Sequence, residues 1–359
     1  MKKKLINKKR IYRGKIKILK RKKSLYIKKL LKIFLIIIIL LFSMKKDYHE
    51  VHIALNIDNK YLYQSLVFIT SLLENRNSTT IYDIHILATQ NIISVHQDKS
   101  QILLKKYGDK YLNISYINMD NDFMGALTGP YISTAAYYRI ALPSLLPYLD
   151  RIIYCDSDII NFKDLTEMYE LKLDNNTYFK GMLDYSSMMN EMNFIDMPRD
   201  KYVNSGILLM NLKSMRMNNV EKKIRDFIGK YFLNHHDQTA INGVCYNNWE
   251  VLSIKYACFN FDDYSTIVKY NKELNEKYRY SEEELKQAFY EPTLLHFGGY
   301  DKPWNLGSSR PKNKYWWYYA KKSGLYEEIL NHYNFKKDDV EQQLNAIPKD
   351  GGLIKKNYL

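Results

Sequence analysis

Cysteine, proline and glycine are all scarce in this chain of 359 residues. The three cysteines, Cys155, Cys245 and Cys258, are too few and too unevenly spaced to form a disulfide framework or a four-ligand zinc site. The 8 prolines and 14 glycines form no linker-like stretch, and the sequence contains no internal repeat. We therefore expect one large domain rather than several domains joined by flexible linkers.

Acidic residues are absent from the first 46 positions, which contain 18 of the 54 lysines and arginines. The remaining residues, 47–359, contain 36 basic and 39 acidic side chains, a net charge of −3. The net charge of +15 belongs to one terminal segment and does not indicate a folded basic face, so we expect no nucleic-acid partner. Because 46% of the residues are hydrophobic, the chain can form a core, which excludes disorder for most of its length.

A long apolar run is also missing from the N-terminal segment. Its longest uncharged run covers twelve residues, 33–44, and reaches residue 30 only if Lys32 is included. A helix that spans a bilayer needs about 20 apolar residues, with about 17 as a lower limit. Three interpretations fit: a short single-pass signal anchor over residues 30–44, a signal peptide without an A-x-A cleavage site, or a basic segment on an anionic membrane surface. From these interpretations we expect residues 1–46 to associate with a membrane, and the topology stays open.

From residue 51 onward, strand-like and helix-like segments alternate. Short apolar runs predict strands at residues 51–57, 82–88, 113–118 and 151–155, and helical spacing predicts helices at 62–73, 93–107 and 133–142. This alternation is typical of an α/β domain with a mostly parallel sheet. The later pattern predicts strands at 179–183, 206–211 and 293–297, helices at 215–232 and 316–330, and an acidic, loop-rich stretch at 261–291. We expect one domain over residues 47–330, followed by a C-terminal tail over residues 331–359.

Two carboxylates directly follow the predicted strand 151–155, in a D-S-D triplet from Asp156 to Asp158. In an open sheet, ligands bind beyond the carboxyl ends of the strands, and paired carboxylates there can hold a hard divalent cation. A second D-x-D triplet, from Asp120 to Asp122, also follows a predicted strand. Because Asp and Asn are common in solvated turns, spacing alone does not choose between the two triplets.

A denser cluster of polar residues follows the last predicted strand. Residues 296–304 have the sequence HFGGYDKPW, with one histidine, two glycines and one lysine. The imidazole of His296 can complete the coordination of a cation such as Mn²⁺, and Lys302 supplies a positive charge for a pyrophosphate. The glycines allow backbone N–H groups to approach phosphate oxygens. A single histidine after a strand is usually structural, but the combination indicates a segment that binds phosphate and metal.

Six segments of the sequence occur in an order that resembles a known family. They are VHIALNID (51–58), Tyr138-Arg139, YCDSD (154–158), NSGILLMN (204–211), Asp237-Gln238 and His296-x-x-Gly299-x-x-Lys302-Pro303-Trp304. Together they are similar to glycosyltransferase family 8, the retaining nucleotide-sugar transferases that include bacterial lipopolysaccharide galactosyl- and glucosyltransferases and glycogenin. The resemblance extends from about residue 50 to residue 325. It implies a GT-A fold, in which a Rossmann-like catalytic domain has a mixed, mostly parallel sheet and binds a UDP-sugar and a divalent cation, Mn²⁺ or Mg²⁺.

The resemblance also assigns roles to the matching positions. It implies three metal ligands, Asp156, Asp158 and His296, which leaves Asp120 and Asp122 as donor-side or structural residues. It implies that the transferred sugar is surrounded by four catalytic residues, Gln238, Asp184, Asn204 and Asp237. Purely structural roles remain alternatives for some of these positions, because Asn204 can cap a turn and Asp237-Gln238 can open a helix.

The resemblance places the contacts to the UDP-sugar at Asn56, Asp58, Tyr61, Arg139, Gly299 and Lys302. The first three lie in the strand–helix turn that holds uracil and ribose, although many relatives carry a small apolar residue at position 56. Gly299 and Lys302 hold the diphosphate. Arg139 reaches the donor sugar or phosphate, with an ion pair to a surface acidic residue as the structural alternative.

The implied function is the metal-dependent transfer of a hexose from a UDP-sugar to a glycan or lipid-linked acceptor, with retention of configuration, in cell-surface or lipopolysaccharide-type glycan synthesis. The catalytic domain would face the cytoplasm in a bacterium and the lumen in a Golgi enzyme. A catalytically inactive, membrane-tethered protein that binds sugar nucleotides or glycans is the alternative. A D-x-D phosphatase with Asp156 as nucleophile is less compatible, because such enzymes usually have Thr or Val where Ile160 stands.

Overall fold

The computed structural model describes residues 26–34, 48–123, 133–184, 187, 189, 200–231 and 235–345. The chain divides into two compact units, Met1–Tyr48 and His49–Leu359. In the first unit, residues 26–34 form a helix, and most of the predicted anchor, residues 35–44, lies outside the described residues. Among the residues that the structure describes, no helix has both the length and the apolar character that a membrane crossing requires.

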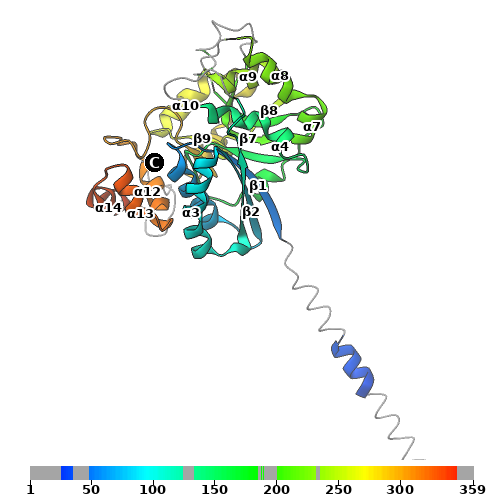
Figure 1. Ribbon diagram of the computed structural model, residues 1–359. Helices are drawn as coiled ribbons and strands as arrows, with labels where there is room; N and C mark the ends of the chain where they lie inside the picture. Colours follow the sequence, from blue (N-terminus) through cyan, green and yellow to red (C-terminus); the bar gives the residue numbers. More distant parts are fainter. Residues whose placement is uncertain are drawn as a thin grey trace, which may run out of the picture. The chain divides into compact units, whose positions relative to one another are not determined.

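The second unit is built on a seven-stranded sheet in the order β3-β2-β1-β4-β7-β6-β8 (Figure 1). Its strands are β1 (His49–Asn56), β2 (Thr80–Ala88), β3 (Leu112–Asn118), β4 (Ile152–Cys155), β6 (Phe179–Leu183), β7 (Val203–Met210) and β8 (Trp249–Val251). Strand β1 is parallel to its neighbours β2 and β4, whereas β7 is antiparallel to β4 and β6. The sheet is therefore mixed and mostly parallel, which confirms the α/β class predicted from the sequence.

A second, smaller sheet has three strands in the order β5-β10-β9. Its strands are β5 (Ile159–Asn161), β9 (Cys258–Phe259) and β10 (Leu294–His296). Strand β5 starts four residues after β4 ends, so the D-S-D triplet forms the link between the two sheets. The antiparallel pairing of β5 with β10 brings the end of the chain's last strand back to this link.

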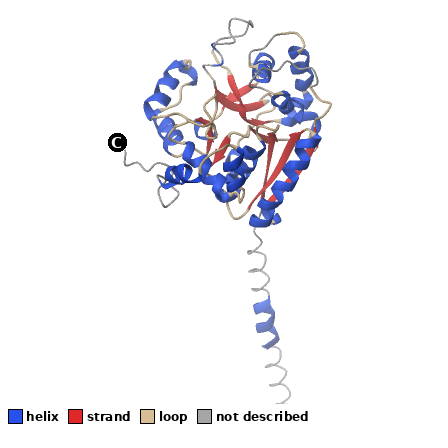
Figure 2. Ribbon diagram, turned by 60° about the vertical axis from the view of Figure 1, so that its left-hand side comes forward, coloured by secondary structure: helices blue, strands red, loops and turns tan. Residues whose placement is uncertain are grey.

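Helices lie on both sides of the main sheet (Figure 2). The longest ones, α2 (Leu62–Asn75) and α3 (Gln90–Tyr107), connect the parallel strands β1, β2 and β3. The others are α4 (Leu142–Leu145), α5 (Thr166–Tyr169), α7 (Leu212–Met217), α8 (Val220–Ile228), α9 (His236–Cys245), α10 (Tyr264–Glu273), α11 (Glu282–Tyr290), α12 (Asn313–Lys322), α13 (Tyr326–His332) and α14 (Lys337–Asn345). Four 3₁₀ helices complete the described secondary structure: η1 (Asp109–Tyr111), η2 (Thr134–Ala141), η3 (Ile254–Tyr256) and η4 (Glu276–Tyr278).

The core follows from the apolar runs of the central strands. All four residues of β4 are fully buried, and in β1 the side chains of Val51, Ile53 and Leu55 are fully buried as well. A strand with both faces buried reads as a continuous apolar run, as β4 does. This packing holds the carboxyl ends of β1 and β4 side by side, where ligands bind in open α/β sheets.

Three predicted helices differ from the observed ones because local signals interrupt them. The segment predicted as a helix over 133–142 is the 3₁₀ helix η2, and a separate helix, α4, begins at Leu142 with Pro143 in its first turn, a position that proline favours. The predicted helix 215–232 is divided into α7 and α8 at Asn219, which has φ of 52°. The predicted helix 316–330 is divided into α12 and α13 at Gly324, which has φ of 84°. Both divisions use residue types that tolerate the left-handed region.

The expectation that residues 261–291 are loop-rich is wrong. This stretch contains α10, η4 and α11. Their beginnings are capped by side chains: Asp263 accepts a hydrogen bond from the backbone N–H of Thr266, and Ser281 and Glu284 form a reciprocal capping box. Several of the acidic residues that suggested a loop, Asp263 and Glu282–Glu284, therefore stand at helix starts, where a negative charge stabilises the first turn.

The chain continues to pack after residue 330. In α14 the side chain of Val340 is fully buried in the same core as the main sheet. An ion pair between Lys321 of α12 and Glu341 of α14 joins the two helices at the surface. Residues 346–359 lie outside the described residues.

Candidate active site

The structure brings together Asp156, Asp158 and His296. One ligand atom from each lies within 4.8 Å of the ligand atoms of the other two. The two aspartates follow β4, and His296 ends β10, where the antiparallel register places it opposite Ile159. A pairing between strands that are far apart in sequence therefore joins the D-S-D triplet to the histidine cluster.

Asp158 is the most tightly held of the three residues, with only 5% of its surface exposed. One carboxylate oxygen lies 3.2 Å from Nε2 of His296, and the other forms an ion pair with Lys302. Burial alone would raise the pKa of Asp158, but Lys302 and His296 outweigh it and hold the pKa well below its ordinary value. Asp158 is therefore an ionised carboxylate with its charge directed toward the histidine and the lysine.

Lys302 lies in the loop that follows β10 and is oriented by the backbone. Its ammonium group donates a hydrogen bond to the carbonyl of Phe297 at 2.7 Å in addition to its ion pair with Asp158. The loop is fixed at its far end, where Nε1 of Trp317 donates to the carbonyl of Pro303 at 3.0 Å. Gly299 within the loop has φ of 84°, a conformation that strains any residue with a side chain.

Arg139 is buried between two carboxylates, and 4% of its surface is exposed. Nη2 donates to Asp156 at 2.9 Å, and Nε lies 3.1 Å from Asp237. Tyr154 donates to the same oxygen of Asp156 at 2.7 Å. Arg139 does pair with acidic residues, but not with a surface acid as the structural alternative expected, because Asp237 is buried as well. The contact of Arg139 with a donor sugar stays a prediction.

Asp237 provides a pH dependence that can be tested. Burial, together with the charge of Asp156, raises the pKa of Asp237 to about 6, although Arg139 opposes the shift. Between the ordinary value of 3.8 and about 6, the folded protein binds more protons at this carboxyl than the unfolded chain, so its contribution to stability decreases as pH rises.

Relative to the Asp237→Asn variant, the wild-type protein should lose about 2–3 kcal/mol of unfolding free energy between about pH 3.5 and pH 6.5. Urea unfolding of both proteins in a chelating buffer, repeated across this range, measures the difference. A difference that stays constant with pH, or that grows in favour of the wild type, contradicts the raised pKa.

A second group of polar side chains lies where β6 ends and β7 begins. Nδ2 of Asn204 donates to Asp184 at 3.0 Å, and Nε2 of Gln238 approaches the same oxygen at 3.4 Å. The side-chain oxygen of Gln238 accepts a hydrogen bond from the backbone N–H of Ser205 at 3.0 Å. Ser205 also donates to Asp237 at 3.2 Å, so a continuous polar network leads from Asp184 to the Arg139 ion pairs.

This network bears on the two roles considered for Asp237 and Gln238, as site residues or as capping residues that open α9. Asp237 and Gln238 lie in the first turn of the helix, but neither is its N-cap, which is His235 and has no side-chain capping bond. Their side chains contact Ser205 of β7 instead. Asn204 caps a turn in addition to its contact with Asp184, because its Oδ1 accepts a hydrogen bond from the backbone N–H of Gly206 at 3.0 Å.

The predicted uridine-side residues lie at the end of β1 and in the turn after it, and β1 is adjacent to β4. Asn56 is 8% exposed, and neither polar atom of its side chain has a hydrogen-bond partner among the described residues. Asp58 accepts hydrogen bonds from the N–H groups of Lys60 and Tyr61 at 2.9 and 3.2 Å and shapes the turn into α2. The ring of Tyr61 meets Trp304 edge-on at 6.3 Å, and burial, with the nearby Asp158, raises its pKa. The effect of Asp158 and Asp156 on the pKa of Tyr61 places this turn beside the metal-ligand group.

The other D-x-D triplet is part of the scaffold. Asp120 accepts a hydrogen bond from the N–H of Gln90 at 3.1 Å, at the start of α3. Asp122 forms two hydrogen bonds with the guanidinium of Arg225, at 2.8 and 3.0 Å. Neither belongs to the metal-ligand group around Asp158.

Gly206 is a site residue that sequence reasoning did not single out. Its backbone carbonyl accepts a hydrogen bond from the N–H of Asp156 at 2.7 Å. A Cβ atom at this position would lie 2.6 Å from Cε1 of His296 and 2.7 Å from Oδ2 of Asp156. The N-S-G sequence of residues 204–206 contained the signal, but only the strand pairing reveals that this glycine faces the metal-ligand group.

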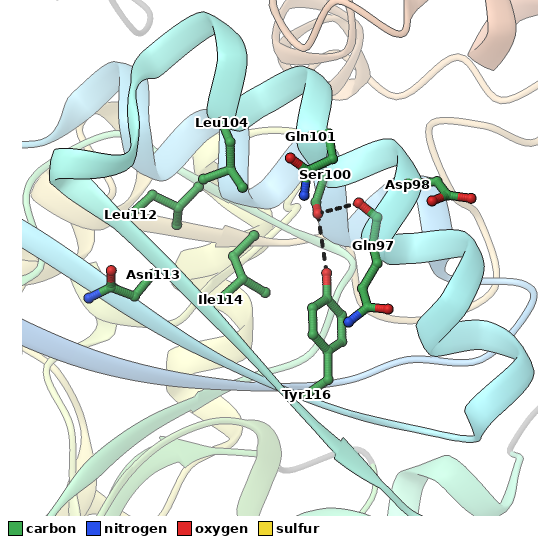
Figure 3. Close-up of a pocket in the computed structure, with 9 residues that line it drawn as sticks. All are labelled: Gln97, Asp98, Ser100, Gln101, Leu104, Leu112, Asn113, Ile114 and Tyr116. Carbon is green, nitrogen blue, oxygen red and sulfur yellow. Dashed lines mark hydrogen bonds between the residues drawn. The ribbon is translucent and has the colours of Figure 1, made fainter.

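A groove of about 580 Å³ lies elsewhere, between α3 and β3 (Figure 3). Ser100 of α3 and Tyr116 of β3 face each other across it with a hydrogen bond of 3.2 Å. No residue of the polar network around Asp158 or Asp184 lines this groove. The chemistry of the cluster, rather than the size of a cavity, therefore identifies the candidate site.

The family model described as "Glycosyl transferase family 8" matches residues 52–306, which include every residue of the candidate site. This chain belongs to glycosyltransferase family 8. This chain is therefore a glycosyltransferase, as the resemblance predicted. Its D-S-D and histidine–lysine motifs both lie inside the matched segment.

Curated relatives are similar over most of this family 8 chain. General stress protein A of Bacillus subtilis (strain 168) is 27% identical over 287 residues, which cover 77% of this chain and 94% of that protein. Lipopolysaccharide 1,2-glucosyltransferase of Escherichia coli (strain K12) is 27% identical over 278 residues, 74% of this chain and 76% of that protein. Glycosyltransferase GlyF of Streptococcus pneumoniae is 25% identical, and the match spans only 60% of its length.

Solved structures share the fold at lower identity. The galactosyltransferase LgtC, in complex with donor and acceptor sugar analogs, aligns with a TM-score of 0.61 at 19% identity and covers 76% of this chain and 96% of its own. The bifunctional glycosyltransferase WbbM aligns with a TM-score of 0.65 at 18% identity over 79% of this chain and 51% of its own. The GT-A fold expected from the sequence is thereby confirmed.

Proposed function

We propose that this family 8 glycosyltransferase moves a hexose from a UDP-sugar to a glycan or lipid-linked acceptor, with retention of configuration and with Mn²⁺ or Mg²⁺ as cofactor. One observation carries the proposal: the ligand atoms of Asp156, Asp158 and His296 converge within 4.8 Å beside Lys302. The two carboxylates and the imidazole suit a divalent cation, and the ammonium group beside them suits a diphosphate.

The residues present fit such a cation. Asp158 and Asp156 supply carboxylate oxygens, which Mn²⁺ and Mg²⁺ prefer, and His296 supplies an imidazole, which favours Mn²⁺ between the two. Arg139 and Tyr154 both bind Oδ1 of Asp156, while Oδ2 lies beside Gly206. A cation held there would stabilise the negative charge that develops on the leaving diphosphate.

The chain's own groups would complete the donor site. Lys302 forms an ion pair with Asp158 and would neutralise the diphosphate, and the turn at Gly299, which glycine adopts without strain, would turn backbone N–H groups toward it. Asn56, whose buried amide has no partner among the described residues, would hydrogen-bond the uridine. Asp58 would contribute by shaping the same turn.

The second polar group would hold the transferred sugar. Asp184 and Asn204 lie within hydrogen-bonding distance of one another, and Gln238 approaches Asp184 from α9. Asp237, also on α9, is linked to this group through Ser205. Both oxygens of Asp184 already accept hydrogen bonds from Ser187, which favours a role in binding hydroxyls over one as nucleophile. The Gln238 amide is a weak nucleophile. Attack of the acceptor on the same face that the diphosphate leaves is therefore the retaining mechanism we favour.

A panel of UDP-sugars tests this function directly. The full-length protein should release UDP in the presence of Mn²⁺, faster with a suitable glycan acceptor, and release should stop in EDTA and return when Mn²⁺ is added. The relationship to an E. coli lipopolysaccharide glucosyltransferase makes UDP-glucose, UDP-galactose and lipopolysaccharide core oligosaccharides the first choices. Binding of UDP-sugar without any UDP release would instead support the inactive, sugar-nucleotide-binding alternative.

We also propose that residues 1–46 attach the enzyme to membranes, because they carry 18 positive charges and no negative ones. The full-length protein should co-sediment with vesicles that contain anionic lipid. A chain that lacks residues 1–46, with a net charge of −3, should not. Equal sedimentation of the two proteins contradicts the proposal.

A further inference from the structure

A second group of possible metal ligands lies outside the donor site, on one face of the main sheet. It consists of His52 on β1 and Asp83 and His85 on β2. The parallel register pairs His52 with Asp83 and Ala54 with His85, and residues two apart in a strand point to the same face. Strand pairing therefore brings the three side chains together, and the small side chain of Ala54 leaves room beside His85.

Two of the three distances within this group match those of a tetrahedral metal site. Nδ1 of His52 lies 3.2 Å from Nε2 of His85 and 3.3 Å from an oxygen of Asp83. Nε2 of His85 lies 3.9 Å from the other oxygen of Asp83. For metal–ligand bonds of about 2.0–2.1 Å, the edges of a tetrahedron are about 3.3–3.4 Å long. Two of the three distances fit these edges. The third is longer and involves the other carboxylate oxygen, so the Asp83 carboxylate has to reorient for one oxygen to meet both histidines.

The surroundings orient the imidazole of His85 for coordination. Its Nδ1 lies 2.8 Å from the hydroxyl of Ser115 on β3, so the opposite nitrogen, Nε2, faces His52 and Asp83. Metal-binding histidines generally bond a second polar group through the ring nitrogen that does not bind the metal. The side chain of His85 is 2% exposed, while those of His52 and Asp83 are 12% and 20% exposed. The group therefore has a buried base and an open side, where water can be the fourth ligand.

We propose that His52, Asp83 and His85 form a second metal site that binds Zn²⁺ and links β1 to β2. Two imidazoles and one carboxylate favour Zn²⁺ over Mg²⁺ and Mn²⁺. His52 precedes Asn56 by four residues on β1, which is about 13 Å along the strand, so this site is separate from the candidate donor site. The site is structural: it holds two parallel strands together far from the sugar donor.

Metal titration of the full-length protein, stripped with a chelator, tests this proposal. Co²⁺ should give the intense visible absorption of a tetrahedral site, and Zn²⁺ should displace it and raise Tm. Both effects should persist in Asp158→Asn, which disables the candidate donor cation site, and in the control His49→Gln, which changes a neighbouring histidine that pairs with Glu170.

His52→Gln and Asp83→Asn should abolish the tetrahedral absorption and the Zn²⁺-dependent rise in Tm. Ser115→Ala should weaken Zn²⁺ binding by about 10–100-fold while all three ligands remain. UDP release should be the same in His49→Gln, Asp83→Asn and the wild type, so failure of the zinc site does not affect the proposed transferase function. Asp83→Asn preserves the shape of the side chain, which separates loss of a ligand from misfolding.

Two results would overturn the second site. One is the absence of tetrahedral Co²⁺ absorption in the wild type at metal concentrations well above that of the protein, which would make the group a hydrogen-bonded histidine pair. The other is equal Zn²⁺ affinity in wild type, His52→Gln and Asp83→Asn, combined with loss of binding in Asp158→Asn, which would assign all binding to the donor site.

Discussion

Asp158→Asn is expected to reduce the turnover of the UDP-sugar by at least about 10³-fold while the fold is retained. The carboxylate of Asp158 is the buried negative charge that faces both His296 and Lys302. Asparagine has nearly the same shape and can still accept a hydrogen bond from Lys302, but it lacks the charge that attracts a divalent cation. The effect should fall mainly on kcat, because the cation acts on charge that develops as the diphosphate leaves.

The matched control is Asp122→Asn, in the other D-x-D triplet. Asp122 pairs with Arg225 at the surface, where an ion pair contributes about 0–1 kcal/mol, so turnover should stay close to that of the wild type. UDP release at saturating Mn²⁺, together with circular dichroism of each variant, compares the two changes. Wild-type turnover in Asp158→Asn would remove this residue from the metal ligands, and equal losses in both variants would point to a general effect on folding.

Gly206→Ala is expected to lower kcat/KM by about 10²-fold or more, although Gly206 carries no functional group. The new methyl group would lie 2.6 Å from His296 and 2.7 Å from Asp156, well inside van der Waals contact. Either the two ligands or β7 must move, and a shift of about 1 Å is enough to misplace a catalytic group. Overpacking of this kind also costs about 1–3 kcal/mol of stability.

Gly229→Ala provides the control for the second prediction. Gly229 ends α8 with helical φ and ψ angles, and the atom nearest to an added methyl group there would be 3.7 Å away. This change should leave UDP release intact and stabilise the fold by about 0.4–1 kcal/mol. Comparing Mn²⁺ dependence, UDP release and Tm for the two alanine variants separates the local steric effect from a loss of stability. Normal Mn²⁺ dependence in Gly206→Ala would contradict the steric argument.

Local patterns in the sequence were sufficient to predict the first four strands of the main sheet and the two helices that connect β1, β2 and β3. The strands β1, β2, β3 and β4 were predicted within a few residues, because apolar runs between polar turns are a local property. The helices α2 and α3 were predicted for the same reason, from their helical spacing. The acidic stretch at 261–291 was misjudged, because its helices are short and the capping bonds of Asp263 and Ser281 outweigh a weak apolar pattern.

The candidate site was predictable only in part. Resemblance selected Asp156, Asp158 and His296, and the structure brings these three together. Neither resemblance nor spacing indicated that Arg139 bridges Asp156 and Asp237, or that Gly206 provides the space beside the metal-ligand group. These relationships depend on contacts between side chains that are far apart in the chain.

The sequence by itself determined the α/β class, the family and the location of the positive charge in residues 1–46. Composition, periodicity and the order of motifs can all be read along the chain without knowing which residues meet in space. The tertiary structure decided which polar residues meet. The β5–β10 register places His296 beside Asp158, and the β1–β2 register places His52 beside Asp83. Strand register results from the packing of the whole core, and no short stretch of sequence contains that information.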